Sequence, residues 1–161
     1  MTRTRIRLTV NGIAHDLEVE PRRLLADVLR HQVGTYGVHL ACEQGACGAC
    51  TVRLDGQLAL ACLTLAVQAD GAEITTVEGL AGPKGELHPV QRAFHIEHGL
   101  QCGYCTPGFV LAAADLLERV PDPDDATIRS ELSGNLCRCT GYTNIVNAVR
   151  TAARLKREPT E

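Results

Sequence analysis

The stretch Cys42-Glu-Gln-Gly-Ala-Cys-Gly-Ala-Cys50 spaces three cysteines in the pattern C-x4-C-x2-C. Three thiols this close can bind one anionic group only if the backbone wraps around it. Gly45 and Gly48 allow that approach, because a residue without Cβ leaves room for backbone N–H groups to point at sulfur. The stretch therefore predicts a ligand loop, and Cys62 supplies a fourth thiol shortly after it.

The amino-terminal quartet consists of Cys42, Cys47, Cys50 and Cys62. Its first three members have the spacing of plant-type [2Fe-2S] sites. The fourth follows much sooner than in plant ferredoxins, so it must come from the adjacent hairpin. The alternative is a zinc knuckle built on Cys47-Gly-Ala-Cys50. Zinc ligands usually come as two close pairs, however, and Cys42 and Cys62 fit that arrangement poorly.

The carboxy-terminal quartet consists of Cys102, Cys105, Cys137 and Cys139. Residues two apart diverge on a strand and on a helix alike, so Cys137 and Cys139 can share a site only from a tight turn. Cys105 precedes a helix start at Thr106-Pro107, where the helix dipole favours the thiolate that binds metal. We expect a second cluster at a joint of a helical bundle. Arg138 either raises the potential of that cluster or simply fills the turn.

Length and composition agree with metal binding by a protein of the cytoplasm. The chain has 161 residues, 45% of them hydrophobic, and can bury a core without disulfides. Its net charge of −3 gives no electrostatic footprint for nucleic acid. No unbroken apolar run is long enough for a signal peptide or a membrane span, so we expect a cytoplasmic location. Thiols stay reduced there, and the eight cysteines are better explained as ligands than as disulfides.

Local patterns predict an α+β fold. Two alternating segments flank Asn11-Gly12 and two flank Asp55-Gly56, so both dipeptides predict hairpins. A helix over residues 24–33 covers the resulting sheet, and a last short strand spans residues 74–77. The glycine- and proline-rich stretch 79–85 resembles a linker and divides the chain into domains 1–79 and 80–161. Helices are expected beyond it, over residues 89–98, 107–119, 125–132 and 144–156.

Three stretches together resemble the small [2Fe-2S] subunit of the xanthine oxidase family of molybdenum hydroxylases, in particular the small subunit of carbon monoxide dehydrogenases. They are Cys42-Glu-Gln-Gly-Ala-Cys-Gly-Ala-Cys50, Gln101-Cys-Gly-Tyr-Cys-Thr-Pro-Gly108 and Gly134-Asn-Leu-Cys-Arg-Cys-Thr-Gly-Tyr142. The resemblance covers nearly the whole chain and occupies all eight ligand positions. It implies an N-terminal ferredoxin-like β-grasp domain followed by an all-α four-helix-bundle domain.

The resemblance also implies a role in electron transfer. Electrons from a molybdopterin site in a large subunit would pass to the cluster of the carboxy-terminal quartet, then to that of the amino-terminal quartet, and finally to FAD in a medium subunit. Gln101 would contact the molybdopterin, of the cytosine dinucleotide type, and Cys139 would lie close to the pterin. The three subunits would form a dimer of heterotrimers, a heterohexamer.

The isolated chain is not expected to catalyse a reaction. Its sequence contains no Gly-x-Gly-x-x-Gly dinucleotide turn, no phosphate-binding loop and no recognisable serine, histidine and acid arrangement. Two other functions compete with the subunit interpretation: a free-standing two-cluster ferredoxin and a zinc-binding interaction module. If the subunit interpretation holds, the substrate would be oxidised in a different chain, whether it is carbon monoxide, an aldehyde, a purine or another N-heterocycle.

Overall fold

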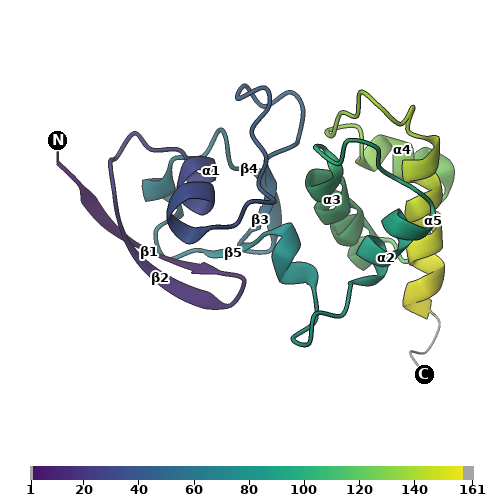
Figure 1. Ribbon diagram of the computed structural model, residues 1–161, viewed down its shortest axis with the longest axis horizontal. Coiled ribbons are helices and arrows are strands. Elements are labelled where there is room, and N and C mark those ends of the chain that lie inside the picture. Colours follow the sequence, from purple (N-terminus) through teal and green to yellow (C-terminus); the bar gives the residue numbers. More distant parts are fainter. Residues whose placement is uncertain (1, 158–161) are drawn as a thin grey trace.

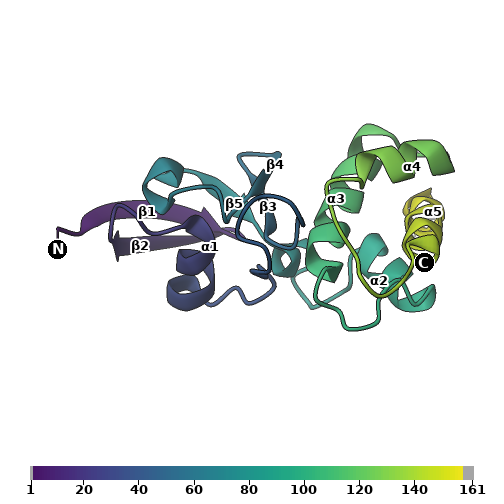
Figure 2. The same cartoon turned by 90° about the horizontal axis from the view of Figure 1, so that it is seen from above.

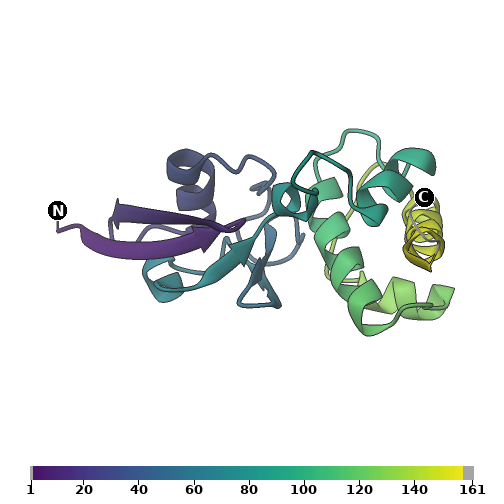
Figure 3. The same cartoon turned by 90° about the horizontal axis from the view of Figure 1, so that it is seen from below.

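The computed structural model describes residues 2–157 and places a sheet-based half beside a helical half along the long axis of the molecule (Figure 1). Views from above and below show the same side-by-side arrangement (Figures 2 and 3). Each half has its own cluster of buried apolar side chains. The expected α+β architecture is therefore confirmed.

The sheet-based half is built on five strands, which lie in the order β2-β1-β5-β3-β4. Their bounds are β1 (Thr4–Val10), β2 (Ile13–Val19), β3 (Thr51–Leu54), β4 (Gln57–Leu60) and β5 (Glu73–Thr75). Strand β1 runs parallel to β5 and antiparallel to β2, and β3 runs antiparallel to both β4 and β5. The sheet is mixed, as the ferredoxin-like expectation requires.

Both predicted hairpins are confirmed. Asn11 and Gly12 have φ values of 51° and 79°, and Asp55 and Gly56 have values of 47° and 80°. Two successive positive φ angles give the turn whose twist matches paired antiparallel strands. The predicted last strand is displaced: β5 ends at Thr75, and residues 77–80 form a short 3-10 helix, η3 (Val77–Leu80).

The helix predicted over residues 24–33 is split. A single turn, α1 (Leu25–Val28), continues as a π-helical turn, η1 (Leu29–Val33), and Gly34 ends it with a φ of 90°. Leu25, Val28 and Leu29 are fully buried in the same cluster as the apolar side chains of β1, so this segment covers the sheet as expected. Another short 3-10 helix, η2 (Ala66–Ala69), follows β4.

The helical half contains four helices around one apolar core. Their bounds are α2 (Pro89–Ile96), α3 (Thr106–Arg119), α4 (Asp125–Glu131) and α5 (Thr143–Arg157). Helix α2 ends two residues earlier than predicted, because His98 itself takes a left-handed conformation with a φ of 51°. None of the helices within residues 2–157 has the length and apolar character needed to cross a bilayer.

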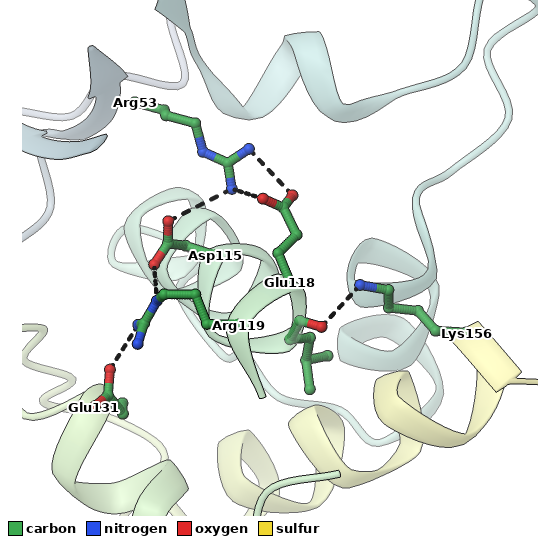
Figure 4. A network of polar contacts seen from close by, with 7 residues as sticks. Arg53, Asp115, Glu118, Arg119, Glu131 and Lys156 are labelled. Carbon is green, nitrogen blue, oxygen red and sulfur yellow. Dashed lines mark hydrogen bonds and ion pairs between the residues drawn. The ribbon is translucent and has the colours of Figure 1, made fainter. Parts of the chain in front are cut away.

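A charged network joins the two halves (Figure 4). Arg53 of β3 lies 3.1 Å from Glu118 and 3.8 Å from Asp115, both on α3. Asp115 also pairs with Arg119 at 3.0 Å, and Arg119 reaches Glu131 of α4 at 2.7 Å. The side chains of Arg53 and Asp115 are only 16% exposed, so this pair lies in the interface between the halves.

Candidate metal centres

The amino-terminal quartet is assembled by the β3–β4 hairpin and the loop before it. Cys50 directly precedes β3 and Cys62 follows β4, so pairing of the two strands brings these residues together. The N–H of Ala61 donates to the carbonyl of Cys50 at 3.2 Å. The Cys62 thiol is then close enough to affect the pKa of Cys50, and the Cys47 thiol is close enough to affect that of Cys42.

The two pairs of this quartet differ in electrostatic environment. The backbone N–H of Gln44 donates to the Cys42 sulfur, and with further hydrogen bonds from the Cys47 thiol and the N–H groups of Ala46 and Cys47 it lowers the pKa of Cys42 to about 6. Burial raises the pKa of the Cys50 thiol to about 12. The loop therefore presents N–H groups to negatively charged sulfur, as its sequence predicts, while the strand end supplies a thiol that must lose its proton to bind metal.

The carboxy-terminal quartet lies where two interhelical segments meet. Cys102 and Cys105 lie between α2 and α3, and Cys137 and Cys139 lie between α4 and α5. The Sγ atoms of Cys102 and Cys139 are 3.6 Å apart, and the thiols of Cys105 and Cys137 are close enough to influence each other's pKa. Two thiolates on one tetrahedral metal, with metal–sulfur bonds near 2.3 Å, would lie about 3.8 Å apart. The observed spacing is close to that value.

The two pairs of this quartet also differ in how far they are buried. Cys102 and Cys139 are exposed, whereas Cys137 is buried and Cys105 half-buried. Burial raises the pKa of the Cys105 thiol to about 12. Burial acts in the same direction on Cys137, but hydrogen bonds from the hydroxyl and N–H of Thr140 and from the N–H of Cys139 outweigh it, and the pKa of Cys137 is lowered. The thiol hydrogen bond with Cys102 raises the pKa of Cys139.

The arrangement of the sulfurs fits a two-iron cluster in each half. Within residues 2–157, no three Cys, His, Asp or Glu side chains converge on the position of one metal ion. The strongest interactions between sulfurs pair Cys42 with Cys47, Cys50 with Cys62, Cys102 with Cys139 and Cys105 with Cys137. A [2Fe-2S] cluster takes two protein ligands on each of its irons, so two pairs per quartet match its needs.

Hydrogen bonds directly connect the amino-terminal ligand loop to the loop between α4 and α5 that carries Cys137 and Cys139. The N–H of Leu136 donates to the carbonyl of Cys47 at 2.9 Å, and the side-chain amide of Asn135 donates to the carbonyl of Gly48 at 2.9 Å. Gly108 of α3 lies against the same carbonyl, and a Cβ there would be 2.3 Å from the Gly48 oxygen. The close contact between the halves is thus made by the backbone that carries the cysteines.

A second connection joins the two halves through His39, before the amino-terminal ligand loop, and Tyr104, between α2 and α3. Their rings stack at 4.6 Å, and His39 Nδ1 lies 2.6 Å from the Tyr104 carbonyl. The Tyr104 hydroxyl donates to the carbonyl of Leu40. An interface role for His39 agrees with the sequence, in which the cysteines already complete both sets of four.

Gln101 and Arg138 are both exposed beside the carboxy-terminal quartet. Sequence reasoning missed Asn135 and Thr140, although both lie in the stretch 134–142 on which the resemblance rests. A single amide or hydroxyl in a loop has no periodicity that distinguishes it, so no local signal could have identified either residue.

Two comparisons with protein families match consecutive parts of the chain. Residues 8–73 match the family described as "2Fe-2S iron-sulfur cluster binding domain", and residues 76–150 match the family described as "[2Fe-2S] binding domain". The first range contains the whole amino-terminal quartet and the second contains the whole carboxy-terminal quartet.

Similar proteins include subunits of bacterial oxidoreductases. The chain is 51% identical to the gamma subunit of caffeine dehydrogenase from a Pseudomonas species, over 92% of this chain and 90% of that one. It is 49% identical to the small subunit of nicotine 6-hydroxylase from Paenarthrobacter nicotinovorans, over 93% and 90% of the two chains. A chain in the crystal structure of quinoline 2-oxidoreductase from Pseudomonas putida superposes with a TM-score of 0.91 at 46% identity, covering 96% of each chain.

Proposed function

The chain belongs to the family of small [2Fe-2S] subunits of molybdenum hydroxylases in the xanthine oxidase family, and we propose that its eight cysteines hold two [2Fe-2S] clusters in a directed electron path. It is an electron-transfer subunit of an oxidoreductase. The amino-terminal quartet holds one cluster and the carboxy-terminal quartet the other. The observation that carries this proposal is that each quartet of cysteines is brought together at one place, with the strongest sulfur–sulfur interactions in two pairs per quartet.

A bound [2Fe-2S] cluster supplies one-electron oxidation and reduction, and the chain supplies the ligands and their surroundings. Exposure supports an entry point at the carboxy-terminal quartet, where Cys102 and Cys139 lie at the surface. The exit point is the loop of the amino-terminal quartet, where Glu43 and Gln44 are exposed. Electrons enter from molybdopterin in a large subunit and leave to FAD in a medium subunit. The isolated chain carries out no catalysis.

Gln101 and Cys139 lie at the molybdopterin, of the cytosine dinucleotide type, in the assembled enzyme. Both are exposed in this chain, which leaves them accessible to a partner subunit. The assembly is a dimer of heterotrimers located in the cytoplasm. The division of the chain into residues 1–79 and 80–161 gives each domain one quartet, and the two separate apolar cores support it.

Iron and sulfide analysis of the purified chain tests the proposal. We expect four iron atoms and four sulfides per chain, and two distinguishable electron paramagnetic resonance (EPR) signals after reduction with dithionite. Stoichiometric zinc without sulfide would refute the cluster assignment and favour the zinc-binding module.

Co-purification from the native source tests the subunit assignment. We expect companion chains that contain molybdopterin and FAD. A native monomer that carries both clusters but no companion would instead identify a free-standing two-cluster ferredoxin.

A further inference from the structure

Cys137 receives a hydrogen bond from a side-chain hydroxyl. The Oγ1 of Thr140 donates to the Cys137 sulfur at 3.1 Å, and the N–H of Thr140 donates to the same sulfur at 3.4 Å. Within residues 2–157, no other cysteine sulfur accepts a hydrogen bond from a hydroxyl group. The contact therefore distinguishes one of the eight sulfurs from the rest.

The direction of the Thr140 hydroxyl is fixed by Tyr142. The N–H of Tyr142 donates to Thr140 Oγ1 at 3.1 Å, so that oxygen acts as the acceptor in this contact. A hydroxyl has one proton to donate, and here that proton is directed to sulfur. Tyr142 itself is held in place, because its hydroxyl accepts the N–H of Cys137 at 3.1 Å and its ring packs edge-on against Phe109.

The backbone of Tyr142 has a φ of 70°, in the left-handed region that bulky residues rarely adopt. This conformation directs the Tyr142 N–H back toward Thr140 while its side chain reaches Cys137. The turn 137–142 thus holds an oriented donor against one sulfur, and the contacts of two side chains stabilise it.

The contact acts where electrostatic interactions are strong. Cys137 is only 8% exposed and packs within the apolar core of the helical half. Hydrogen bonds to charged groups are stronger than neutral ones, and low local dielectric strengthens them further. Hydrogen bonds to the sulfurs are among the factors that set the potential of an iron–sulfur cluster. Because reduction makes the cluster more negative, a fixed donor stabilises the reduced state more than the oxidised state.

We propose that Thr140 is a positioning residue that raises the reduction potential of the cluster held by the carboxy-terminal quartet, and so makes it a better first acceptor. The inference rests on the proposed function. One electron from the molybdopterin centre of the large subunit, or from dithionite in an assay, enters the cluster. No covalent bond forms or breaks, and the proton stays on Thr140 Oγ1.

Thr140→Val removes the hydroxyl and keeps the shape of the side chain and the backbone N–H. In a redox titration of the full chain followed by EPR, we expect this variant to increase the ratio of oxidised to reduced carboxy-terminal cluster about tenfold at the native midpoint potential. A tenfold change corresponds to a shift of about 59 mV to lower potential for a one-electron couple. Thr140→Ser keeps a hydroxyl and should restore a potential close to that of the native chain.

Two controls accompany this variant. The amino-terminal cluster in the same sample should keep its potential, because Thr140 contacts none of its sulfurs. Thr64→Val removes a hydroxyl two residues from Cys62 that donates to the carbonyl of Leu60 at 3.1 Å rather than to sulfur. This control should leave both potentials unchanged.

The proposal is overturned if Thr140→Val leaves the carboxy-terminal potential unchanged, shifts both potentials equally, or is not rescued by Thr140→Ser. Should Thr140→Val lose its iron, Thr140→Ala takes its place, because it also lacks the hydroxyl and keeps the backbone N–H. Electron–nuclear double resonance of the reduced carboxy-terminal cluster in H2O and D2O should then show one strongly coupled exchangeable proton fewer in Thr140→Ala than in the native chain or Thr140→Ser, and equal numbers refute the contact. Absence of iron and sulfide from the native chain would refute the proposed function instead.

Discussion

Replacing Gly108 with alanine should push α3 away from the amino-terminal ligand loop, where the two halves are in tight contact. A Cβ at this position would lie 2.3 Å from the Gly48 carbonyl oxygen and 2.8 Å from the Asn135 amide nitrogen. Real Cβ atoms essentially never approach a neighbour more closely than 3.0 Å, so α3 must move away from the ligand loop by about 0.7 Å or more. The buried hydrogen bond from Asn135 to Gly48 lies directly in the way.

Three free-energy terms decide the size of the effect. Overpacking of a tight contact costs about 1–3 kcal/mol, and loss of the buried hydrogen bond costs about 1 kcal/mol. Alanine is favoured over glycine in a helix by about 1 kcal/mol, which offsets part of this loss. We therefore expect Gly108→Ala to lower the free energy of unfolding by about 1–3 kcal/mol. For a chain of this length, that corresponds to a decrease of about 2–12 °C in the midpoint of thermal unfolding.

Gly134→Ala is the matched control. It lies beside Asn135 in the same interface, yet a Cβ there would meet no atom within 4 Å. Thermal unfolding followed at the visible absorbance of the clusters gives the midpoint, and EPR of the fully reduced chain measures the magnetic interaction between them. Gly108→Ala should weaken that interaction as well as the stability. A native midpoint for Gly108→Ala, or an equal loss for Gly134→Ala, would refute the importance of this contact.

Burial lowers the pKa of His88 in the folded chain, and its ring must be neutral to accept a hydrogen bond from Val90 at the start of α2. In the unfolded chain His88 has its ordinary pKa of 6.5 and therefore binds a proton more readily than in the folded chain. Stability should therefore fall as pH decreases below about 6.5, and His88→Asn should lessen this dependence. The prediction fails if the difference between the thermal midpoints at neutral and acidic pH is the same in His88→Asn as in the native chain. In the iron-free chain at neutral pH, iodoacetamide should modify Cys42, whose pKa is about 6, well before Cys50, whose pKa is about 12, as peptide mapping over time would show. Equal rates for the two thiols would argue against the hydrogen-bonded ligand loop. Arg53→Met removes ionic contacts to two carboxylates of α3 and should lower the free energy of unfolding by about 1–3 kcal/mol. Arg5→Met removes an exposed ion pair and should change the free energy of unfolding by less than about 1 kcal/mol. Equal losses in chemical denaturation would show that burial of Arg53 contributes nothing.

The features predicted from the sequence are those that depend on short-range chemistry. The dipeptides Asn11-Gly12 and Asp55-Gly56 form the predicted hairpin turns, because their residues tolerate positive φ angles. Apolar alternation in β1 likewise places Ile6 on the buried face. The last strand was predicted two residues too far, since its apolar pattern continues into Val77. That side chain leaves the sheet and packs against the helical core, a tertiary contact that a local pattern does not contain.

The same distinction applies to the metal centres. Spacing is the basis of the predicted division into two quartets, and it contains no information on which sulfurs approach each other within a quartet. Cys102 lies three residues from Cys105, yet its sulfur meets that of Cys139. From its charge, Arg138 was a candidate to raise the potential of the carboxy-terminal cluster. The structure instead places the neutral hydroxyl of Thr140 against a ligand sulfur. Pairing and donor orientation depend on the turn between α4 and α5, whose conformation is set by contacts with Tyr142.

The contacts between the halves explain how two clusters can work in series on one chain. The glycine-rich stretch 79–85 alone would suggest a flexible tether. Just before it, however, the side chain of Asn11 exchanges two hydrogen bonds of 2.9 Å with Thr76, which anchors the start of this stretch to the sheet-based half. On the other side, the N–H of Leu136 and the amide of Asn135 end on carbonyls of the opposite ligand loop. The loops that carry the two quartets are therefore held against each other by hydrogen bonds beside the cysteines, which fixes the position of one site relative to the other.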